Sequence, residues 1–184
     1  MFQKLLSKIS RELTKSRIPY MVIGGQAVLI YGEPRLTRDI DITLGIGVDE
    51  LEKILKTATR LKLRVLKDGI EDFVRKTMVL PTMDQKSGIR VDFIFSFSPY
   101  EMQAIKKANT VMIGKTPVKF ASLEDVVIHK IIAGRARDIE DVKSILIKNP
   151  DYNADYITQW LREFDESLGE NYCETFRKVV EDIK

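Results

Sequence analysis

The chain has 184 residues, 44% of them hydrophobic and 31% charged, which is typical of a globular protein large enough for one well-buried domain. No stretch approaches the roughly 18 consecutive apolar residues of a membrane span, and the N-terminus lacks the apolar core of a signal peptide. We therefore expect a cytoplasmic protein with no membrane partner. One histidine (His129) and one cysteine (Cys173) exclude a conventional zinc site and an internal disulfide, so a bound metal should be a hard cation held by carboxylates.

The charge is unevenly distributed along the chain. The net charge is +3, but residues 151–184 contain nine acidic and four basic side chains, which leaves about +8 in residues 1–150. Such a basic region either helps to bind a polyanion or is an ordinary solvated surface, and the sequence leaves both interpretations open.

Hydrophobic periodicity predicts alternating helices and strands in the first two thirds of the chain. Leu5, Ile9 and Leu13 are spaced by four, as on an amphipathic helix, and other short apolar runs bounded by glycine predict strands. In chain order we expect a helix over 2–15, a strand over 20–23, a helix over 26–31, a strand over 39–44, a helix over 50–60 capped by Asp49, strands over 62–66, 73–80 and 89–95, and a hairpin over 111–120.

Only helices are predicted beyond this point. Ser122 and Asp125 have the spacing of a helix cap, and further helices are expected over 137–148 and after Pro150. The predicted fold class is therefore α+β, with a mixed sheet flanked by helices in residues 1–121. A helical region follows over 122–184 and is expected to pack on this core, so that the two could form one domain.

Two aspartates stand out on the strand predicted over 39–44. Side chains alternate between the faces of a strand, so Asp39 and Asp41 should lie on one face, about 7 Å apart. Two such carboxylates repel each other unless a cation lies between them. If the extended backbone continues towards the N-terminus, Arg35 and Thr37 share this face, and the guanidinium could approach bound phosphates.

A third carboxylate and a glycine pair complete the pattern. Asp92 lies in an otherwise apolar strand, where an unpaired carboxylate is costly. If that strand neighbours residues 39–44, three carboxylates meet, which is enough to hold two divalent cations. Gly24 and Gly25 end one strand and open a helix, a position where backbone N–H groups can approach an anion closely.

These motifs resemble a known family. Ile23-Gly24-Gly25, thirteen further residues and then Asp39-Ile40-Asp41 resemble the signature of the polymerase-β-like nucleotidyltransferase superfamily. The Arg-x-Thr-x-Asp-x-Asp form of residues 35–41 is similar to that of its minimal branch, which includes the AbiEii-type abortive-infection toxins. The resemblance implies a nucleotidyltransferase fold, in which Gly24 and Gly25 hold the nucleoside triphosphate.

The resemblance also implies the remaining site residues. Asp39 and Asp41 would bind Mg²⁺ (or Mn²⁺), and Asp92 would be the third metal-binding and catalytic carboxylate, helping an acceptor hydroxyl to attack the α-phosphate. Residues 123–141 are similar to a motif of the toxin-like branch in which a lysine and an aspartate line the nucleotide site, here Lys130 and Asp138.

The function predicted from these motifs is a Mg²⁺-dependent transfer of an NMP group from an NTP, such as ATP, to a hydroxyl, with release of pyrophosphate. The acceptor could be RNA such as tRNA, a protein or a small molecule. The alternative is a nucleotide-binding toxin–antitoxin interaction protein without turnover, with an antitoxin or toxin as its partner. Aromatic residues that recur at helical spacing in 152–176 predict packing of the tail or a homodimer contact.

Overall fold

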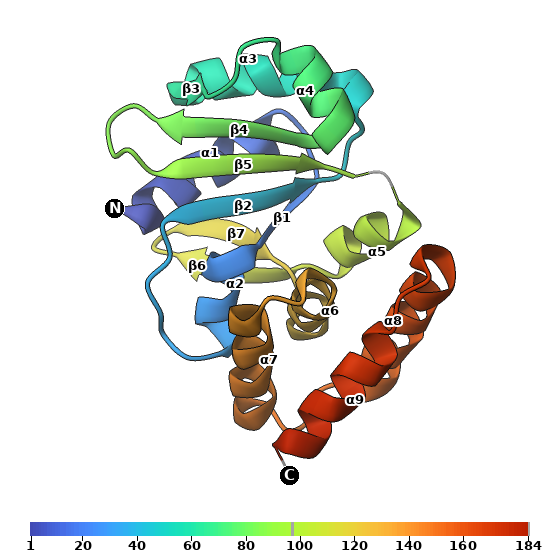
Figure 1. Cartoon of the computed structure of the whole chain (residues 1–184). Helices are drawn as coiled ribbons and strands as arrows, with labels where there is room; N and C mark the ends of the chain where they lie inside the picture. The colour runs from blue at the N-terminus through green and yellow to red at the C-terminus, as the bar shows by residue number, and fades with distance from the viewer. Residues whose placement is uncertain (97, 184) are drawn as a thin grey trace. The chain divides into compact units, whose positions relative to one another are not determined.

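The computed structural model describes residues 1–96 and 98–183 and divides into two compact units (Figure 1). The sheet unit comprises Met1–Gln26 and Leu36–Ala121, and the helical unit comprises Ala27–Arg35 and Ser122–Lys184, of which Lys184 lies outside the described residues. Residues 27–35, which the sequence analysis places in the core, thus belong to the helical unit. The expected packing of residues 122–184 on the core stays a prediction.

The sheet unit is built on one mixed sheet of seven strands in the order β3-β4-β5-β2-β1-β7-β6 (Figure 1). β2 runs antiparallel to β1 and parallel to β5, so the two strands that carry aspartates are neighbours. The strands are β1 (Tyr20–Ile23), β2 (Asp39–Leu44), β3 (Leu63–Val65), β4 (Val79–Asp84), β5 (Arg90–Phe95), β6 (Asn109–Ile113) and β7 (Thr116–Phe120).

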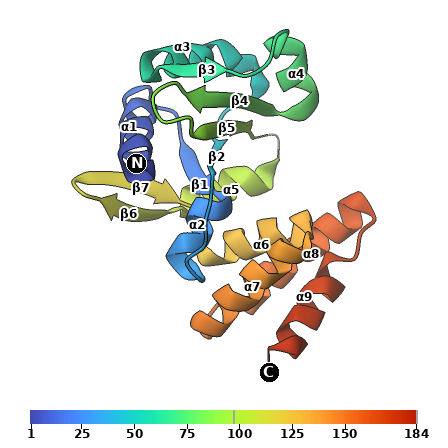
Figure 2. The same cartoon turned by 60° about the vertical axis from the view of Figure 1, so that its left-hand side comes forward.

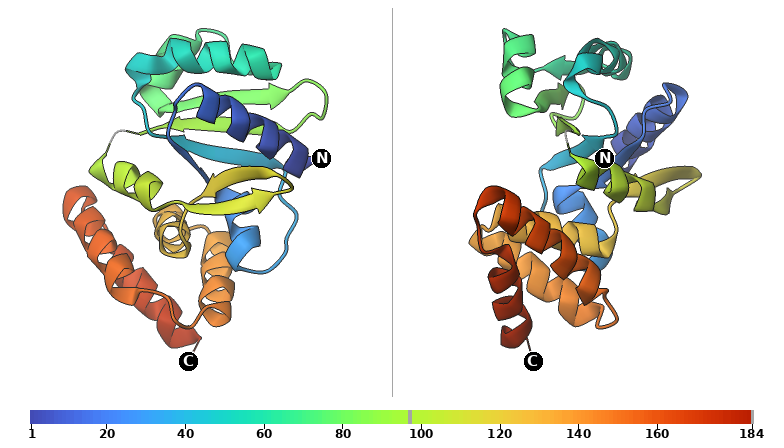
Figure 3. Two further views of the ribbon diagram at one scale, coloured as in Figure 1. Left: turned by 180° about the vertical axis from the view of Figure 1, so that it is seen from behind. Right: turned by 90° about the vertical axis from the view of Figure 1, so that its right-hand side faces the viewer.

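Helices cover one face of this sheet. The view from behind shows α1 crossing in front of the strands (Figure 3, left), and α1 contacts both α3 and β7. Ile40 and Ile42 of β2 and Phe93 of β5 are completely buried. Asp41 and Asp92, which alternate with them along the strands, are partly accessible on the other face. The helices of this unit are α1 (Phe2–Lys15), the 3₁₀ turn η1 (Val48–Glu50), α3 (Leu51–Leu61), α4 (Ile70–Thr77) and α5 (Pro99–Lys107).

The helical unit consists of the end of α2 (Gly24–Tyr31), which begins in the sheet unit, with α6 (Leu123–Ala133), α7 (Ala136–Lys148), α8 (Ala154–Leu168) and α9 (Tyr172–Asp182). α6 contacts α7, α8 and α9, and α8 and α9 lie side by side (Figures 1 and 2). As predicted, Ser122 caps α6 by accepting a hydrogen bond from the backbone N–H of Asp125. Asp125 is fully buried and accepts a hydrogen bond from the Tyr156 hydroxyl of α8 at 3.0 Å. Burial and the adjacent carboxylate raise the pKa of Tyr156.

Two predictions of local structure are wrong, and one helix was missed. Residues 73–80 are not one strand, because α4 ends at Thr77 and β4 begins at Val79, with Met78 between them in the left-handed conformation (φ 58°). Asp49 does not cap the next helix, which instead follows η1 and begins at Leu51 without a side-chain cap. The helix α5 was not predicted, although Ser98 and Glu101 form a capping box with a proline at the first turn, a recognisable helix signal.

No helix in residues 1–96 and 98–183 is long and apolar enough to cross a membrane.

Candidate active site

The carboxylates of Asp39, Asp41 and Asp92, here called the carboxylate trio, lie on two adjacent strands of the sheet unit. In the parallel pairing of β2 with β5, Asp41 lies opposite Asp92, and Asp39 lies opposite Arg90. Paired residues of a sheet point to the same face, and neighbouring strands are about 4.8 Å apart. The register therefore confirms that the strand carrying Asp92 neighbours residues 39–44, and it gathers the trio on one face.

Gly24 lies directly against one member of the trio. A Cβ atom built on Gly24 would lie 2.0 Å from Oδ2 and 2.9 Å from Cγ of Asp41, closer than real Cβ atoms approach other atoms. Gly24 also has φ +63°, a conformation that residues with a side chain rarely adopt. The glycine predicted to bind an anion therefore has a second role, since it leaves the space that the Asp41 carboxylate occupies.

Arg90 was missed by the sequence analysis. Its Nε donates a hydrogen bond to Oδ1 of Asp92 at 2.8 Å. This hydrogen bond, and then the charges of Asp92, Asp39 and Asp41, raise the pKa of the Arg90 guanidinium, while its partial burial acts in the opposite direction. Arg90 is thus a protein cation that contacts the trio, through Asp92. The sequence offered a signal, because Arg90 is two residues from Asp92 and thus on the same strand face.

The trio has the donor chemistry of a site for a hard divalent cation. Carboxylate oxygens are the ligands that Mg²⁺ and Mn²⁺ prefer. Because Gly24 has no side chain, the Asp41 carboxylate has room on this face. In the described part of the chain, no three His, Cys, Asp or Glu side chains are gathered closely enough to hold a metal ion. The three carboxylates are of the right chemical type for a divalent cation and lie on the same strand face. One of them, Asp92, forms an ion pair with Arg90.

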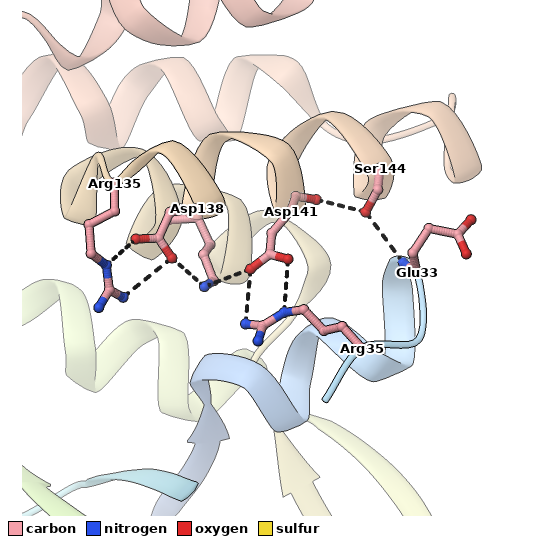
Figure 4. Close-up of polar contacts among 7 residues, drawn as sticks. Glu33, Arg35, Arg135, Asp138, Asp141 and Ser144 are labelled. Carbon is pink, nitrogen blue, oxygen red and sulfur yellow. Dashed lines mark hydrogen bonds and ion pairs between the residues drawn. The ribbon is translucent and has the colours of Figure 1, made fainter. Parts of the chain in front are cut away.

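The helical unit contains a second group of charged residues, Arg35, Lys130, Arg135, Asp138 and Asp141, of which Figure 4 labels all but Lys130. We call this group the buried ion network after its buried members Lys130, Asp138 and Asp141, since the Arg135 side chain is 77% exposed. Nζ of Lys130 lies 2.5 Å from Oδ1 of Asp138 and 2.9 Å from Oδ2 of Asp141. The side chains of Lys130 and Asp138 are only 8% and 2% exposed. Burial by itself raises the pKa of Asp138, but the hydrogen bonds from Arg135 and Lys130 outweigh it and lower this pKa.

The residues predicted ahead of Asp39 do not continue its strand, because β2 begins at Asp39. Arg35 belongs to the helical unit and forms a two-point ion pair with Asp141, with Nε 2.9 Å from Oδ1 and Nη2 3.0 Å from Oδ2 (Figure 4). Thr37 is buried, accepts a hydrogen bond from Gln26 Nε2 and donates one to the carbonyl of Asp39. The expected single row of side chains on one strand face is therefore wrong, since local hydrogen bonds and Asp141 provide better partners.

The comparison with family models decides the classification. Residues 5–182 match the model described as nucleotidyl transferase AbiEii toxin of type IV toxin–antitoxin systems. The chain belongs to the AbiEii nucleotidyltransferase family. This agrees with the resemblance seen in the glycine pair and the aspartate strand.

Solved structures show that this AbiEii-family chain has the nucleotidyltransferase fold. ANT(2″)-Ia in complex with adenylyl-2″-tobramycin is 16% identical, with a TM-score of 0.62 over 91% of this chain and 98% of that one. An antigenic nucleotidyltransferase-like protein from Paracoccidioides brasiliensis is 17% identical, with a TM-score of 0.58 over 90% and 87%. Lincomycin-bound lincosamide adenylyltransferase LnuA is 16% identical, with a TM-score of 0.53 over 77% and 94%. A search of curated proteins found no match.

Proposed function

We propose that this protein transfers an NMP group from an NTP to an acceptor hydroxyl and depends on Mg²⁺ or Mn²⁺. The observation that carries the proposal is the carboxylate trio, placed on one face by the β2–β5 register with Asp41 set against Gly24. Membership of a nucleotidyltransferase family supports the reaction class. A bound divalent cation would neutralise the triphosphate and lower the pKa of the attacking hydroxyl.

The chain's own residues have distinct parts in this reaction. Asp39, Asp41 and Asp92 would hold the cation, and Gly24 and Gly25 would bring backbone N–H groups to the triphosphate. The acceptor oxygen bonds to the α-phosphorus, the bond from that phosphorus to the bridging oxygen breaks, and pyrophosphate leaves with the electron pair. The carboxylate of Asp92 accepts the hydroxyl proton. Lys130 and Asp138 of the helical unit, which the sequence analysis expects at the nucleotide, pair with each other, so the proposed reaction is assigned to residues of the sheet unit alone.

The similar proteins and the family description indicate which substrates and partners to test first. One solved neighbour is named an adenylyltransferase and another is in complex with adenylyl-2″-tobramycin, which makes ATP the first NTP to test. For the acceptor, RNA such as tRNA, a protein and a small molecule all present suitable hydroxyls. The family description makes an antitoxin the partner to test for binding, because it assigns the family to type IV toxin–antitoxin systems.

The test measures labelling of total RNA, protein and metabolites with each α-³²P-labelled NTP in the presence of Mg²⁺. Asp39→Ala and Asp41→Ala are each expected to abolish labelling, because the cation loses a ligand. The matched control is Asp68→Ala, which removes an exposed carboxylate of the same unit and should leave labelling unchanged. Full labelling by either active-site variant would exclude the metal assignment.

The second candidate is a nucleotide-binding interaction protein of a toxin–antitoxin pair, which does not turn over. The observation that favours it is that Arg90 pairs with Asp92, one of the three carboxylates that catalysis would need. Calorimetry with ATP and Mg²⁺ combined with an assay for pyrophosphate distinguishes the two functions. Binding without pyrophosphate release from any acceptor pool would establish the second candidate and reject the first.

A further inference from the structure

Arg90 is a cation placed among carboxylates by the sheet itself. It opens β5 opposite Asp39, and two residues later Asp92 lies opposite Asp41. Because the register puts all four side chains on the same face, the guanidinium shares this face with the whole carboxylate trio. Without a positive charge here, adjacent carboxylates on strands about 4.8 Å apart would repel one another.

The ion pair between Arg90 and Asp92 is a single contact made by a half-exposed arginine side chain. The arginine side chain is 52% exposed, whereas the Asp92 side chain is 15% exposed. The contact is a single Nε–H donation to one carboxylate oxygen at 2.8 Å. A long, half-exposed side chain with one such bond can turn into solvent while the carboxylate stays on its strand.

The same guanidinium suits the other charged component of the reaction. An arginine that leaves a carboxylate finds an equivalent partner in a phosphate, because both present oxygens that match the guanidinium geometry. If a divalent cation bound together with a nucleotide, Asp92 would become one of its ligands, and the phosphate oxygens of the nucleotide would replace Asp92 as the partner of Arg90. A divalent cation arriving alone has to displace Arg90 without any compensation.

We propose that Arg90 is an exchangeable counter-cation of the carboxylate trio, which holds Asp92 in the metal-free protein and passes to a nucleotide phosphate when the metal–nucleotide complex binds. Arg90 thereby makes the site weak for a divalent cation alone and strong for a cation together with an NTP. This inference rests on the proposed function, since it takes the trio as the metal site. It assigns to Arg90 two successive roles, as the partner of Asp92 and then as a contact of the nucleotide phosphates.

The experiment is a titration with Mn²⁺, followed by electron paramagnetic resonance, with and without ATP that carries a non-transferable α,β-methylene bridge. In Arg90→Gln, Mn²⁺ alone should bind about threefold to tenfold tighter than in the native protein, in line with the modest strength of a half-exposed ion pair. The gain in Mn²⁺ affinity caused by the nucleotide should shrink in this variant. Arg90→Lys, which keeps the charge but loses the Nε–H donor, should fall between the two.

Thermal unfolding supplies a readout that a purely structural ion pair would not give. Arg90→Gln should unfold at a lower temperature than the native protein without metal, and saturating Mn²⁺ should remove this difference. Arg64→Gln is the matched control, because Arg64 is an exposed arginine of β3, two strands away from β5 in the same sheet. It should change neither measurement.

Two results would overturn the inference. One is an unchanged Mn²⁺ affinity in both Arg90 variants, and the other is a loss of stability that Mn²⁺ does not reverse. Asp41→Asn keeps failure of the inference apart from failure of the proposed function. If Asp41→Asn loses Mn²⁺ binding while the Arg90 variants bind as the native protein does, the metal site stands and the role of Arg90 falls.

Discussion

The two groups of charged residues in this protein have opposite charge balances. In the buried ion network of the helical unit, three cations face two carboxylates, and each aspartate is paired with two of these cations. In the sheet unit, the half-exposed Arg90 pairs with Asp92 on the strand face that also carries Asp39 and Asp41. A pair-rich network holds helices together, whereas an excess of negative charge on a sheet face destabilises the fold unless a further cation binds there. We therefore expect changes in the buried ion network to act mainly on stability and changes in the carboxylate trio to act mainly on ligand binding.

The largest effect on activity is expected from the sheet unit. Asp41→Asn removes one charge of the trio, so the rate of NTP-dependent pyrophosphate release should fall by about a thousandfold or more. The temperature of unfolding should change little, because asparagine has nearly the same size and shape as aspartate. Stopped assays of pyrophosphate and differential scanning calorimetry measure both quantities. A variant that is equally active, or inactive only because it is unfolded, would contradict the contrast between the two regions.

The largest effect on stability is expected from the helical unit. Lys130→Met leaves Asp138 and Asp141 short of a buried partner and should lower the free energy of unfolding by about 3 kcal/mol. The control Lys143→Met removes a lysine of α7 that pairs with the exposed Asp182 and should cost less than about 1 kcal/mol. Urea denaturation followed by circular dichroism compares the two. Equal losses would mean that the network does not stabilise the unit.

Gly24 links backbone conformation to the trio. Gly24→Ala and Gly114→Ala both place a side chain at positive φ, which costs about 1–2 kcal/mol. Only the first variant also drives a Cβ into the Asp41 carboxylate, since nothing lies within 4 Å of a Cβ on Gly114. We expect Gly24→Ala to be less stable than Gly114→Ala and to lose activity and Mn²⁺ affinity. Similar unfolding curves and similar activities for the two variants would show that the close contact is unimportant.

The smallest effect is an acid-side dependence of stability. The pKa of Asp138 is lowered below its ordinary value of 3.8, so in the unfolded chain this residue binds a proton at higher pH than in the folded protein. Its contribution to stability is therefore complete above 3.8 and is lost as the pH falls through the lower, folded value. Asp138→Asn should flatten this acid-side slope in urea denaturation.

Glu174 is the control for this measurement. Its pKa is also lowered, first by its hydrogen bond with Arg177, but it lies on the surface of α9, where solvent screens the charge. Glu174→Gln should leave the slope unchanged. A flattened slope in this variant, with none in Asp138→Asn, would assign the acid sensitivity to the surface.

Much of the fold could be predicted because its signals are local. The period-four spacing of α1, the cap at Ser122 and the turn at Gly114 depend on near neighbours in the chain, and all were predicted. The error over residues 73–80 joined two short apolar runs, Phe73-Val74 and 78–80, into one strand, although Ile70, Phe73 and Val74 have helical spacing. For such short segments the packing against neighbouring elements, rather than the pattern, decides between helix and strand.

The sequence by itself determined the chemistry of this protein: the glycine pair, the alternating aspartates on β2 and the third carboxylate on β5, since residue type and a period of two require nothing beyond the strand. Only the tertiary structure decided which residues meet. The β2–β5 register places Asp92 opposite Asp41 and Arg90 on the same face. In the helical unit, Arg35 forms an ion pair with Asp141. The physical reason is that pairing between distant segments depends on long-range packing and charge, which no local pattern encodes.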